Sequence, residues 1–307
     1  MQNILHKGSS MKFTKYVFIL TFILLLAACA QPVAETAKPQ VVATTNILGD
    51  VVDVIGGDKI ELTVLFPWNA DPHSFEPTPK DLAKIERADI VFINGLGLEE
   101  TMEHTLLDVS ANLIPVSNGV ETIALENGNE HQGADPHVWM DPGNVAVWAE
   151  NIAAALSDLD PANAETYRAN ADAYITELER LKVWISAQVD QVPPGQRILV
   201  TDHDNLGYFA AAYGFEIVGT VIPGASTLAE PSAQQLAEIE DTIRAYGVPA
   251  IFIGTTVNPN LAQRISKDTG VQLVALYTGS LSDASGPAPT YLEMMRHNVI
   301  AIVEALR

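Results

Sequence analysis

The feature that most constrains this 307-residue chain is one long segment without a structure breaker. Pro161 opens a stretch with no further proline and no glycine until Pro193-Pro194-Gly195. Apolar residues recur along it at helical spacing: Tyr167, Tyr174, Leu178, Leu181 and Ile185. At about 1.5 Å per residue such a helix spans roughly 40 Å, the diameter of a small domain. We therefore expect residues 158–194 to form one long, rigid helix that links two separately folded parts.

The part before this helix, residues 41–157, alternates short apolar runs with amphipathic stretches. The runs predict strands at residues 41–45, 61–66, 89–94 and 112–116. The stretches predict helices at residues 47–55, 79–87, 99–107 and 142–156. Strands that alternate with helices indicate a parallel sheet covered by helices.

The part after the long helix, residues 195–307, repeats this alternation. Strands are predicted at residues 198–201, 216–218, 250–253 and 272–275, and helices at residues 205–213, 231–246, 259–269 and 291–306. The predicted fold class is therefore α/β, with two lobes, each a parallel sheet flanked by helices, joined by one long rigid α-helix.

The first residues, 1–29, have the composition of a targeting segment. Lys12 and Lys15 precede an apolar core at residues 17–26, and Leu26-Ala27-Ala28-Cys29 forms a small-residue cleavage site that ends in cysteine. The apolar run is short for a transmembrane helix. It resembles a bacterial lipoprotein signal in which Cys29 is lipidated, with an ordinary secretory signal as the alternative. Residues 30–40, rich in Ala, Pro, Gln and Thr, predict a flexible tether.

Cysteine and charge limit the chemistry that is available. Cys29 is the only cysteine, so a lipidated chain has no disulfide and no thiolate for a metal. A transition-metal site must then use histidine and carboxylate. The formal net charge is −21, and residues 1–29 hold three lysines and no acid, so the processed chain is more acidic still. Such a surface repels nucleic acid and attracts cations.

Two copies of Asp-Pro-His give the strongest functional signal. The first is Asp71-Pro72-His73, followed by Glu76-Pro77-Thr78-Pro79, and the second is Asp135-Pro136-His137, followed by Val-Trp-Met-Asp-Pro. Each histidine lies on a proline-stiffened loop that leads into a predicted helix start. Two imidazoles at loop–helix junctions are what a metal site between secondary elements requires.

A third histidine lies at a comparable place in the second part of the chain. Thr201-Asp202-His203-Asp204 comes directly after the first strand of that part, and His73 follows the second strand of the first part. In open α/β sheets, ligands bind outside the carboxyl ends of the strands, so both histidines are placed where a ligand site is expected.

Together these features resemble the solute-binding lipoproteins of zinc and manganese ABC importers. The resemblance covers nearly the whole chain, from the cysteine-ending signal through both Asp-Pro-His motifs to the closing Thr-Tyr-Leu-Glu-Met-Met-Arg-His-Asn at residues 290–298. It implies a metal site between two α/β lobes, an extracytoplasmic protein held to the membrane by lipid on Cys29, permease subunits of an ABC importer as partners, and a monomer.

The resemblance also implies the metal ligands. The family's first three ligands correspond to His73, His137 and His203. Its fourth, an aspartate that precedes Ser-Leu, corresponds to Gly279 here, so that ligand is missing. Asp283, four residues later, is the candidate substitute, and a water molecule is the alternative.

Three neutral imidazoles favour Zn²⁺ over Mn²⁺, which prefers oxygen ligands, so zinc is predicted first and manganese second. The resemblance alone leaves the metal open. Many zinc-binding members carry a long His-rich loop between the first two histidines, and here residues 126–132 form a short segment with the single histidine His131.

Two other function classes compete with a transport receptor. Three histidines with an open fourth position also suit a zinc hydrolase or lyase, in which the metal activates water. The sequence contains neither His-Glu-x-x-His nor Gly-x-Ser-x-Gly, however, and we expect no enzyme activity. A metal-binding surface adhesin is the other alternative.

Overall fold

The computed structural model describes residues 37–102, 106, 112–125 and 133–307. Residues Lys38–Arg307 form one compact unit. Among the residues described, no helix combines the length and the apolarity needed to cross a membrane. The predicted signal segment, Cys29, His6, His104 and the 126–132 segment with His131 lie outside the described residues.

The first half of the unit is a four-stranded parallel sheet with the order β2-β1-β3-β4. The strands are β1 (Gln40–Ala43), β2 (Glu61–Val64), β3 (Ile90–Ile93) and β4 (Leu113–Pro115). The helices are α2 (Asn46–Gly56), α3 (Pro79–Arg87) and α5 (Pro142–Leu159). Most of the helix predicted at residues 99–107 lies outside the described residues; the structure describes a 3₁₀ turn at Glu100–Met102 and Leu106 in helical conformation.

The second half repeats this topology with the order β6-β5-β7-β8, again all parallel. Its strands are β5 (Ile198–Thr201), β6 (Glu216–Thr220), β7 (Ala250–Gly254) and β8 (Gln272–Leu276). Its helices are α7 (Gly207–Tyr213), α8 (Ala233–Tyr246), α9 (Asn260–Thr269) and α10 (Tyr291–Leu306). Two parallel sheets flanked by helices confirm the predicted fold class.

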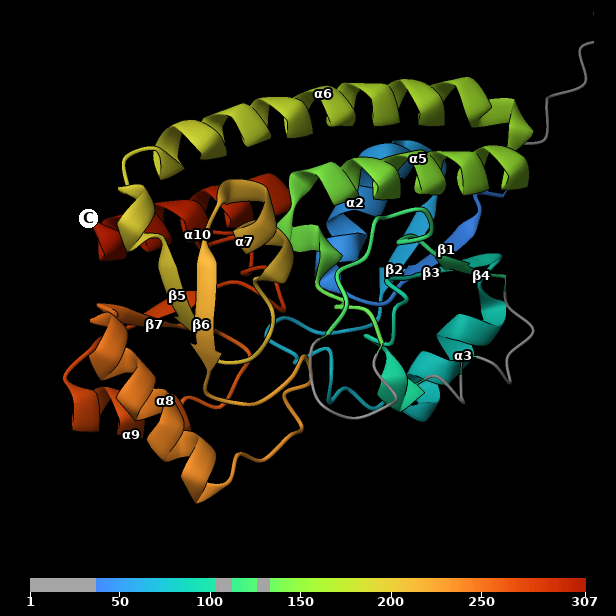
Figure 1. Cartoon of the computed structure of the whole chain (residues 1–307). Coiled ribbons are helices and arrows are strands. Elements are labelled where there is room, and N and C mark those ends of the chain that lie inside the picture. The colour runs from blue at the N-terminus through green and yellow to red at the C-terminus, as the bar shows by residue number, and fades with distance from the viewer. Residues whose placement is uncertain (1–36, 103–105, 107–111, 126–132) are drawn as a thin grey trace, which may run out of the picture. The chain divides into compact units, whose positions relative to one another are not determined.

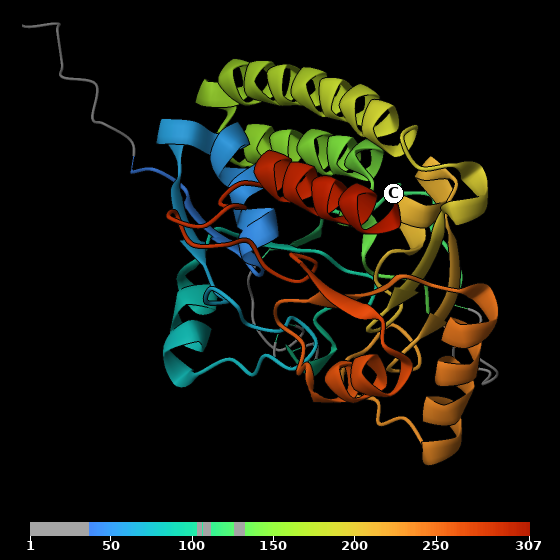
Figure 2. The ribbon, with the colours of Figure 1, turned by 90° about the vertical axis from the view of Figure 1, so that its left-hand side faces the viewer.

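The long helix α6 (Ala164–Val189) has 26 residues. It packs on α2 and α5 of the first half and on α10 of the second, and Figures 1 and 2 show these helices lying side by side along one edge of the unit. Its buried face carries Tyr167, Tyr174, Leu178, Leu181 and Ile185, the residues that predicted it. The predicted division into lobes at 41–157 and 195–307 stays a prediction, because both halves belong to one compact unit.

Alternation along the strands explains why each sheet has two apolar faces. Val41 and Ala43 of β1 pack into the core that contains α6, whereas Val42 packs on the other face with α3. In the second half, Leu199 joins the α6 core and Val200 packs toward α8 and α9. Since successive side chains point to opposite faces, strands buried on both faces are apolar throughout. One core thus runs from β1 to α10 beneath α6.

Candidate metal centre

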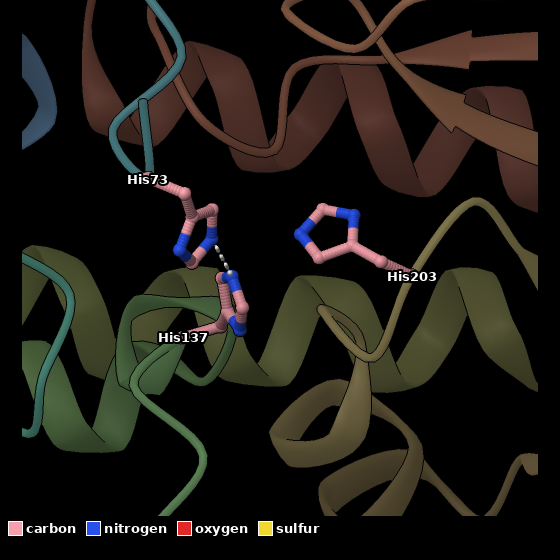
Figure 3. A group of neighbouring side chains, drawn as sticks. All are labelled: His73, His137 and His203. Atoms are coloured by element: carbon pink, nitrogen blue, oxygen red, sulfur yellow. Dashed lines mark hydrogen bonds between the residues drawn. The ribbon is translucent and has the colours of Figure 1, made fainter. Parts of the chain in front are cut away.

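Three histidines from distant parts of the chain converge in one buried pocket (Figure 3). His73 follows β2, His137 follows the second Asp-Pro, and His203 follows β5. The ring centroids of His73 and His137 lie 5.1 Å apart, those of His137 and His203 5.1 Å, and those of His73 and His203 5.5 Å. One ring nitrogen from each lies within 4.8 Å of the other two. All three side chains are buried.

The two Asp-Pro-His motifs hold their histidines in the same way. The Asp71 carboxylate accepts the backbone N–H of His73 at 3.1 Å, and the Asp135 carboxylate accepts that of His137 at 2.9 Å. Proline between them cannot donate and has a fixed φ, so the aspartate closes a tight turn over it. The repeated motif is therefore a repeated backbone turn that presents an imidazole.

The helix starts predicted after both motifs are present. Thr78 caps α3 in a capping box with Asp81, with Pro79 at the first helical position. Asp141 caps α5 by accepting the backbone N–H of Gly143 at 2.8 Å, and Pro142 follows it. These caps fix where each histidine loop meets its helix, because they satisfy N–H groups that the helix leaves free.

Two carboxylates orient the imidazoles. Nδ1 of His137 lies 2.8 Å from Asp135 Oδ1, and Nδ1 of His203 lies 2.8 Å from Asp202 Oδ1. A proton on Nδ1 that is donated to the carboxylate leaves the Nε2 lone pair free for a metal, as in many carboxylate–histidine–metal arrangements. Nε2 of His203 is buried and has no hydrogen-bond partner among the residues that the structure describes, which is costly unless a ligand uses it.

The contact between His73 and His137 also indicates that their Nε2 atoms are available to a metal. Nε2 of His73 and Nε2 of His137 lie 3.0 Å apart. If the proton of His137 is on Nδ1, its Nε2 accepts, and the proton of this contact belongs to His73 Nε2. Binding of a metal by His73 Nε2 then requires the neutral tautomer of His73 with its proton on Nδ1.

Burial keeps His73 neutral. Removal from water, with a smaller effect from His137 and His203, lowers the pKa of His73 from 6.5 to about 2. Burial disfavours the charged imidazolium, and neighbouring imidazoles that share positive charge disfavour it further. A neutral ring has no proton to lose before it binds a metal at neutral pH.

The family comparison agrees with this geometry. Residues 41–305 match the ZnuA family model, described as "Zinc-uptake complex component A periplasmic". The chain belongs to this family. Members of this family are metal-binding, substrate-binding lipoproteins of ABC importers. The protein is therefore a non-enzymatic transporter component, and its candidate metal site contains three histidines.

Individual relatives differ in the metal that their names state. The manganese-binding lipoprotein MntA of Halalkalibacterium halodurans is 35% identical over 303 residues, which cover 96% of this chain and 99% of MntA. The iron ABC transporter lipoprotein MtsA of Streptococcus pyogenes is 31% identical over 97% of this chain and 99% of MtsA. The periplasmic zinc-binding protein TroA from Treponema pallidum superposes with a TM-score of 0.82 at 30% identity, covering 88% of this chain and 99% of TroA.

The position where the family resemblance predicts an aspartate does line the pocket. Gly279 lies against Pro72 beside His73, and Thr256 and Thr278 complete the wall. A Cβ at residue 279 would stand 2.8 Å from Thr256 Oγ1 and 3.1 Å from Pro72 Cδ. Both distances are tighter than ordinary contacts, so this ZnuA-family chain is packed around a glycine there.

Asp283, the candidate substitute, lies elsewhere in this structure. Its carboxylate is exposed and accepts hydrogen bonds from the backbone N–H of Ser285 at 2.8 Å and from the Ser285 hydroxyl at 2.6 Å. These donors lower the pKa of Asp283 below its usual value. Among the residues that the structure describes, no Asp or Glu joins the three histidines as a fourth member of the group.

Sequence reasoning missed the residues that fasten the second motif. Asn94, at the end of β3, donates to the carbonyl of Pro136 at 3.0 Å, and the Tyr208 hydroxyl of α7 donates to the carbonyl of Asp135 at 2.9 Å. Trp139, two residues after His137, also fastens this region. It is buried beside the His137 ring, and its indole N–H donates to the carbonyl of Thr278 at 2.9 Å, which ties the two halves together.

Asp202 and His297 also have defined partners. Asp202 accepts from Asn205 Nδ2 at 2.9 Å and from the backbone N–H of Gly254 at 2.6 Å, so it is fully engaged behind His203. Burial alone would raise the pKa of Asp202, but the neighbouring His203 and the backbone N–H groups of Gly254 and His203 outweigh it and lower the pKa. His297 is on α10, with its ring against Tyr277 and outside the three-histidine group.

Proposed function

We propose that this chain captures Zn²⁺ at His73, His137 and His203 and delivers it to the permease subunits of an ABC importer. The observation that carries the proposal is the convergence of three buried imidazoles with no described carboxylate in the same group. Neutral imidazole nitrogen suits zinc, whereas a site for manganese is expected to contain carboxylate oxygen.

Charge in the surroundings supports cation binding. Asp135 and Asp202 lie directly behind two of the rings, at 2.8 Å from their Nδ1 atoms. These carboxylates raise the basicity of the ligating nitrogens and offset part of the +2 charge without touching the ion. The fourth coordination position is proposed to be taken by water, because Asp283 is bound to Ser285 and Gly279 has no side chain.

Manganese is the second candidate, and the names of relatives favour it. MntA is named as manganese-binding at 35% identity, and MtsA is named for iron. Members of this family are therefore named for different metals. The donor atoms argue for zinc in this chain, and the relatives argue for testing manganese and iron beside it.

The proposed location follows from the signal segment and the relatives. We place the protein on the extracytoplasmic side of the membrane, as a monomer anchored by lipid on Cys29. Relatives named as lipoproteins support the anchor. The relatives' names give no support to a role in cell adhesion, and that alternative is not proposed.

The test is a competition titration of purified, metal-free protein with Zn²⁺, Mn²⁺ and Fe²⁺. We expect zinc to bind tightest, and His203→Ala to weaken zinc binding by more than about 100-fold, since a ligand is lost. His297→Ala is the matched control, a histidine outside the group, and should bind like the parent. Circular dichroism should show that both variants remain folded.

Two results would count against the proposal in different ways. Tighter binding of Mn²⁺ than of Zn²⁺ by the parent would overturn the metal assignment and keep the site. Parent-like zinc affinity in His203→Ala would overturn the site that joins the two halves.

A further inference from the structure

One hydrogen bond joins the first Asp-Pro-His turn to the opposite half of the unit. The Thr227 hydroxyl, in the loop between β6 and α8, donates to Asp71 Oδ2 at 2.5 Å across 156 residues of sequence. Both residues are half-buried. Because the acceptor is a carboxylate, this is the stronger class of hydrogen bond.

Asp71 connects Thr227 to His73, one of the proposed metal ligands. Its other oxygen, Oδ1, accepts the backbone N–H of His73, so one carboxylate joins the turn that presents His73 to a loop of the second half. Asp135 in the second motif differs, since its Oδ1 is used by both the backbone N–H and the ring of His137. The repeated motif thus has two different uses for its aspartate.

The loop that carries Thr227 is also fastened to the third histidine. The backbone N–H of Ile222 donates to the carbonyl of Asp202 at 2.7 Å, and the backbone N–H of Asp204 donates to the carbonyl of Gly224 at 2.9 Å. These bonds flank His203 on both sides. Residues 222–227 therefore reach from the His203 turn to the His73 turn, and we call them the clasp segment.

The clasp segment forms one wall of a cavity beside His73. This cavity has a volume of about 310 Å³, and it is bordered by Pro223 and Ser226 of the clasp segment and by Glu100 and Pro136 of the first half. Because His73 lines both this cavity and the three-histidine pocket, a displacement of the clasp segment exposes the pocket on the side of His73.

We propose that Thr227 is a positioning residue for metal retention: through Asp71 it holds the clasp segment against the His73 turn and slows release of the bound ion. This inference rests on the proposed function of the three-histidine site. According to this proposal, the Thr227–Asp71 contact keeps the site closed across the two halves, although Thr227 itself does not touch the metal.

The experiment measures the rate at which zinc-loaded protein releases Zn²⁺ to an excess of a chromogenic chelator in stopped flow. Thr227→Val keeps the side-chain shape and removes the hydroxyl, and we expect release to be about tenfold faster, the effect of losing one hydrogen bond to a charged acceptor. Thr227→Ser keeps the hydroxyl and should release zinc at the parent rate. A purely structural role for the threonine methyl group predicts the reverse order.

Ser226→Ala is the matched control. Its hydroxyl donates to the exposed carboxylate of Glu100 at 3.3 Å, in the same segment and also across the two halves, whereas Thr227 donates to the carboxylate that holds the backbone N–H of His73. We expect a release rate within about twofold of the parent, since an exposed contact contributes little. Thermal unfolding of the metal-free variants measures any general loss of stability, so that it can be separated from faster zinc release.

The outcomes separate this inference from the function on which it rests. If the parent binds no zinc, both the proposed function and the role of Thr227 are overturned. If the parent binds zinc and Thr227→Val releases it at the parent rate, or no faster than Ser226→Ala, only the positioning role is overturned. Failure of Thr227→Ser to restore the parent rate would also overturn it.

Discussion

At the scale of single residues, the chain shows how one small side chain changes a site. Gly279 lines the pocket, and Thr256 and Pro72 occupy the space next to it. A carboxylate introduced there must move the Thr256 hydroxyl or Pro72, and Pro72 belongs to the turn that presents His73. The three-histidine ligand set and the glycine are therefore parts of one packing arrangement.

The first prediction concerns Asp283. Because its carboxylate is exposed and held by Ser285, Asp283→Ala should bind Zn²⁺ within about twofold of the parent, the size expected for a distant surface change. Isothermal titration at pH 7 measures this. An affinity loss of tenfold or more would show that Asp283 reaches the metal after all and would restore it as the fourth ligand.

The second prediction concerns the pH dependence of the metal-free protein. His73 has a pKa of about 2 when folded and about 6.5 when unfolded, so between these values the unfolded chain binds one more proton. Proton uptake by His73 in the unfolded chain therefore lowers the free energy of unfolding as pH falls from 6.5 toward 2, by up to about 1.4 kcal/mol per pH unit. Above pH 6.5 His73 is neutral in both states and has no effect of this kind. Urea unfolding at pH 7 and pH 5 measures it.

The comparison variant is His73→Gln, which is neutral at every pH. Its loss of stability between pH 7 and pH 5 should be smaller than that of the parent. Equal losses in the two proteins would contradict a neutral, buried His73.

Sequence patterns predicted the three histidines well and the fourth position poorly, for a physical reason. The turns around His73 and His137 are encoded locally, by aspartate and proline within two residues of each histidine. Whether a loop residue such as Asp283 faces a pocket depends on packing against segments far away in sequence. Asn94 and Tyr208 escaped notice for the same reason: their partners, Pro136 and Asp135, are over 40 residues away.

At the scale of elements, periodicity located the strands and helices to within a few residues. The strand predicted at residues 198–201 is β5, and the helices predicted at residues 79–87 and 291–306 are α3 and α10. The order of strands in each sheet could not be predicted, because an apolar run buried on both faces is compatible with several neighbours.

The third prediction concerns the junction of α2 and α10. Asp50 of α2 accepts the backbone N–H of Tyr291, the first residue of α10, at 2.8 Å. Burial, with smaller effects from Asp53 and Glu293, raises the pKa of Asp50 from 3.8 to about 6, although the Tyr291 N–H opposes the shift. Ionised Asp50 is therefore less favourable in the folded protein than in the unfolded one, and its contribution to stability falls as pH rises from 3.8 through 6.

Asp50→Asn should accordingly raise the free energy of unfolding at pH 7 by about 1–3 kcal/mol and leave it little changed at pH 4, where the parent carboxyl is mostly protonated in the fold. Urea unfolding of metal-free protein measures both values. Asp53→Asn, on the exposed side of the same helix, is the control and should change stability less. A destabilised Asp50→Asn at pH 7 would show that the carboxylate is held ionised by α10.

At the scale of the whole molecule, the proposed lipid anchor determines where the metal is captured. The fourth prediction is that Cys29→Ala moves the protein from the membrane fraction into the soluble fraction of fractionated cells, because the acylated residue is lost. Zinc affinity of the released protein should equal that of the parent, since Cys29 lies outside the unit that holds the site. A variant that stays in the membrane fraction with normal processing would contradict the anchor.

The helix α6 packs against α2, α5 and α10, and a single core continues beneath it from β1 to α10. Rotation of one half relative to the other would disrupt this shared core. The described residues therefore do not favour the whole-domain hinge motion that many binding proteins use. Cargo exchange is then left to loops such as the clasp segment, so the contacts that hold those loops in place set how long the ion stays bound. In a receptor of this kind, single hydrogen bonds between loops can govern the lifetime of the loaded state while the two halves stay fixed relative to each other.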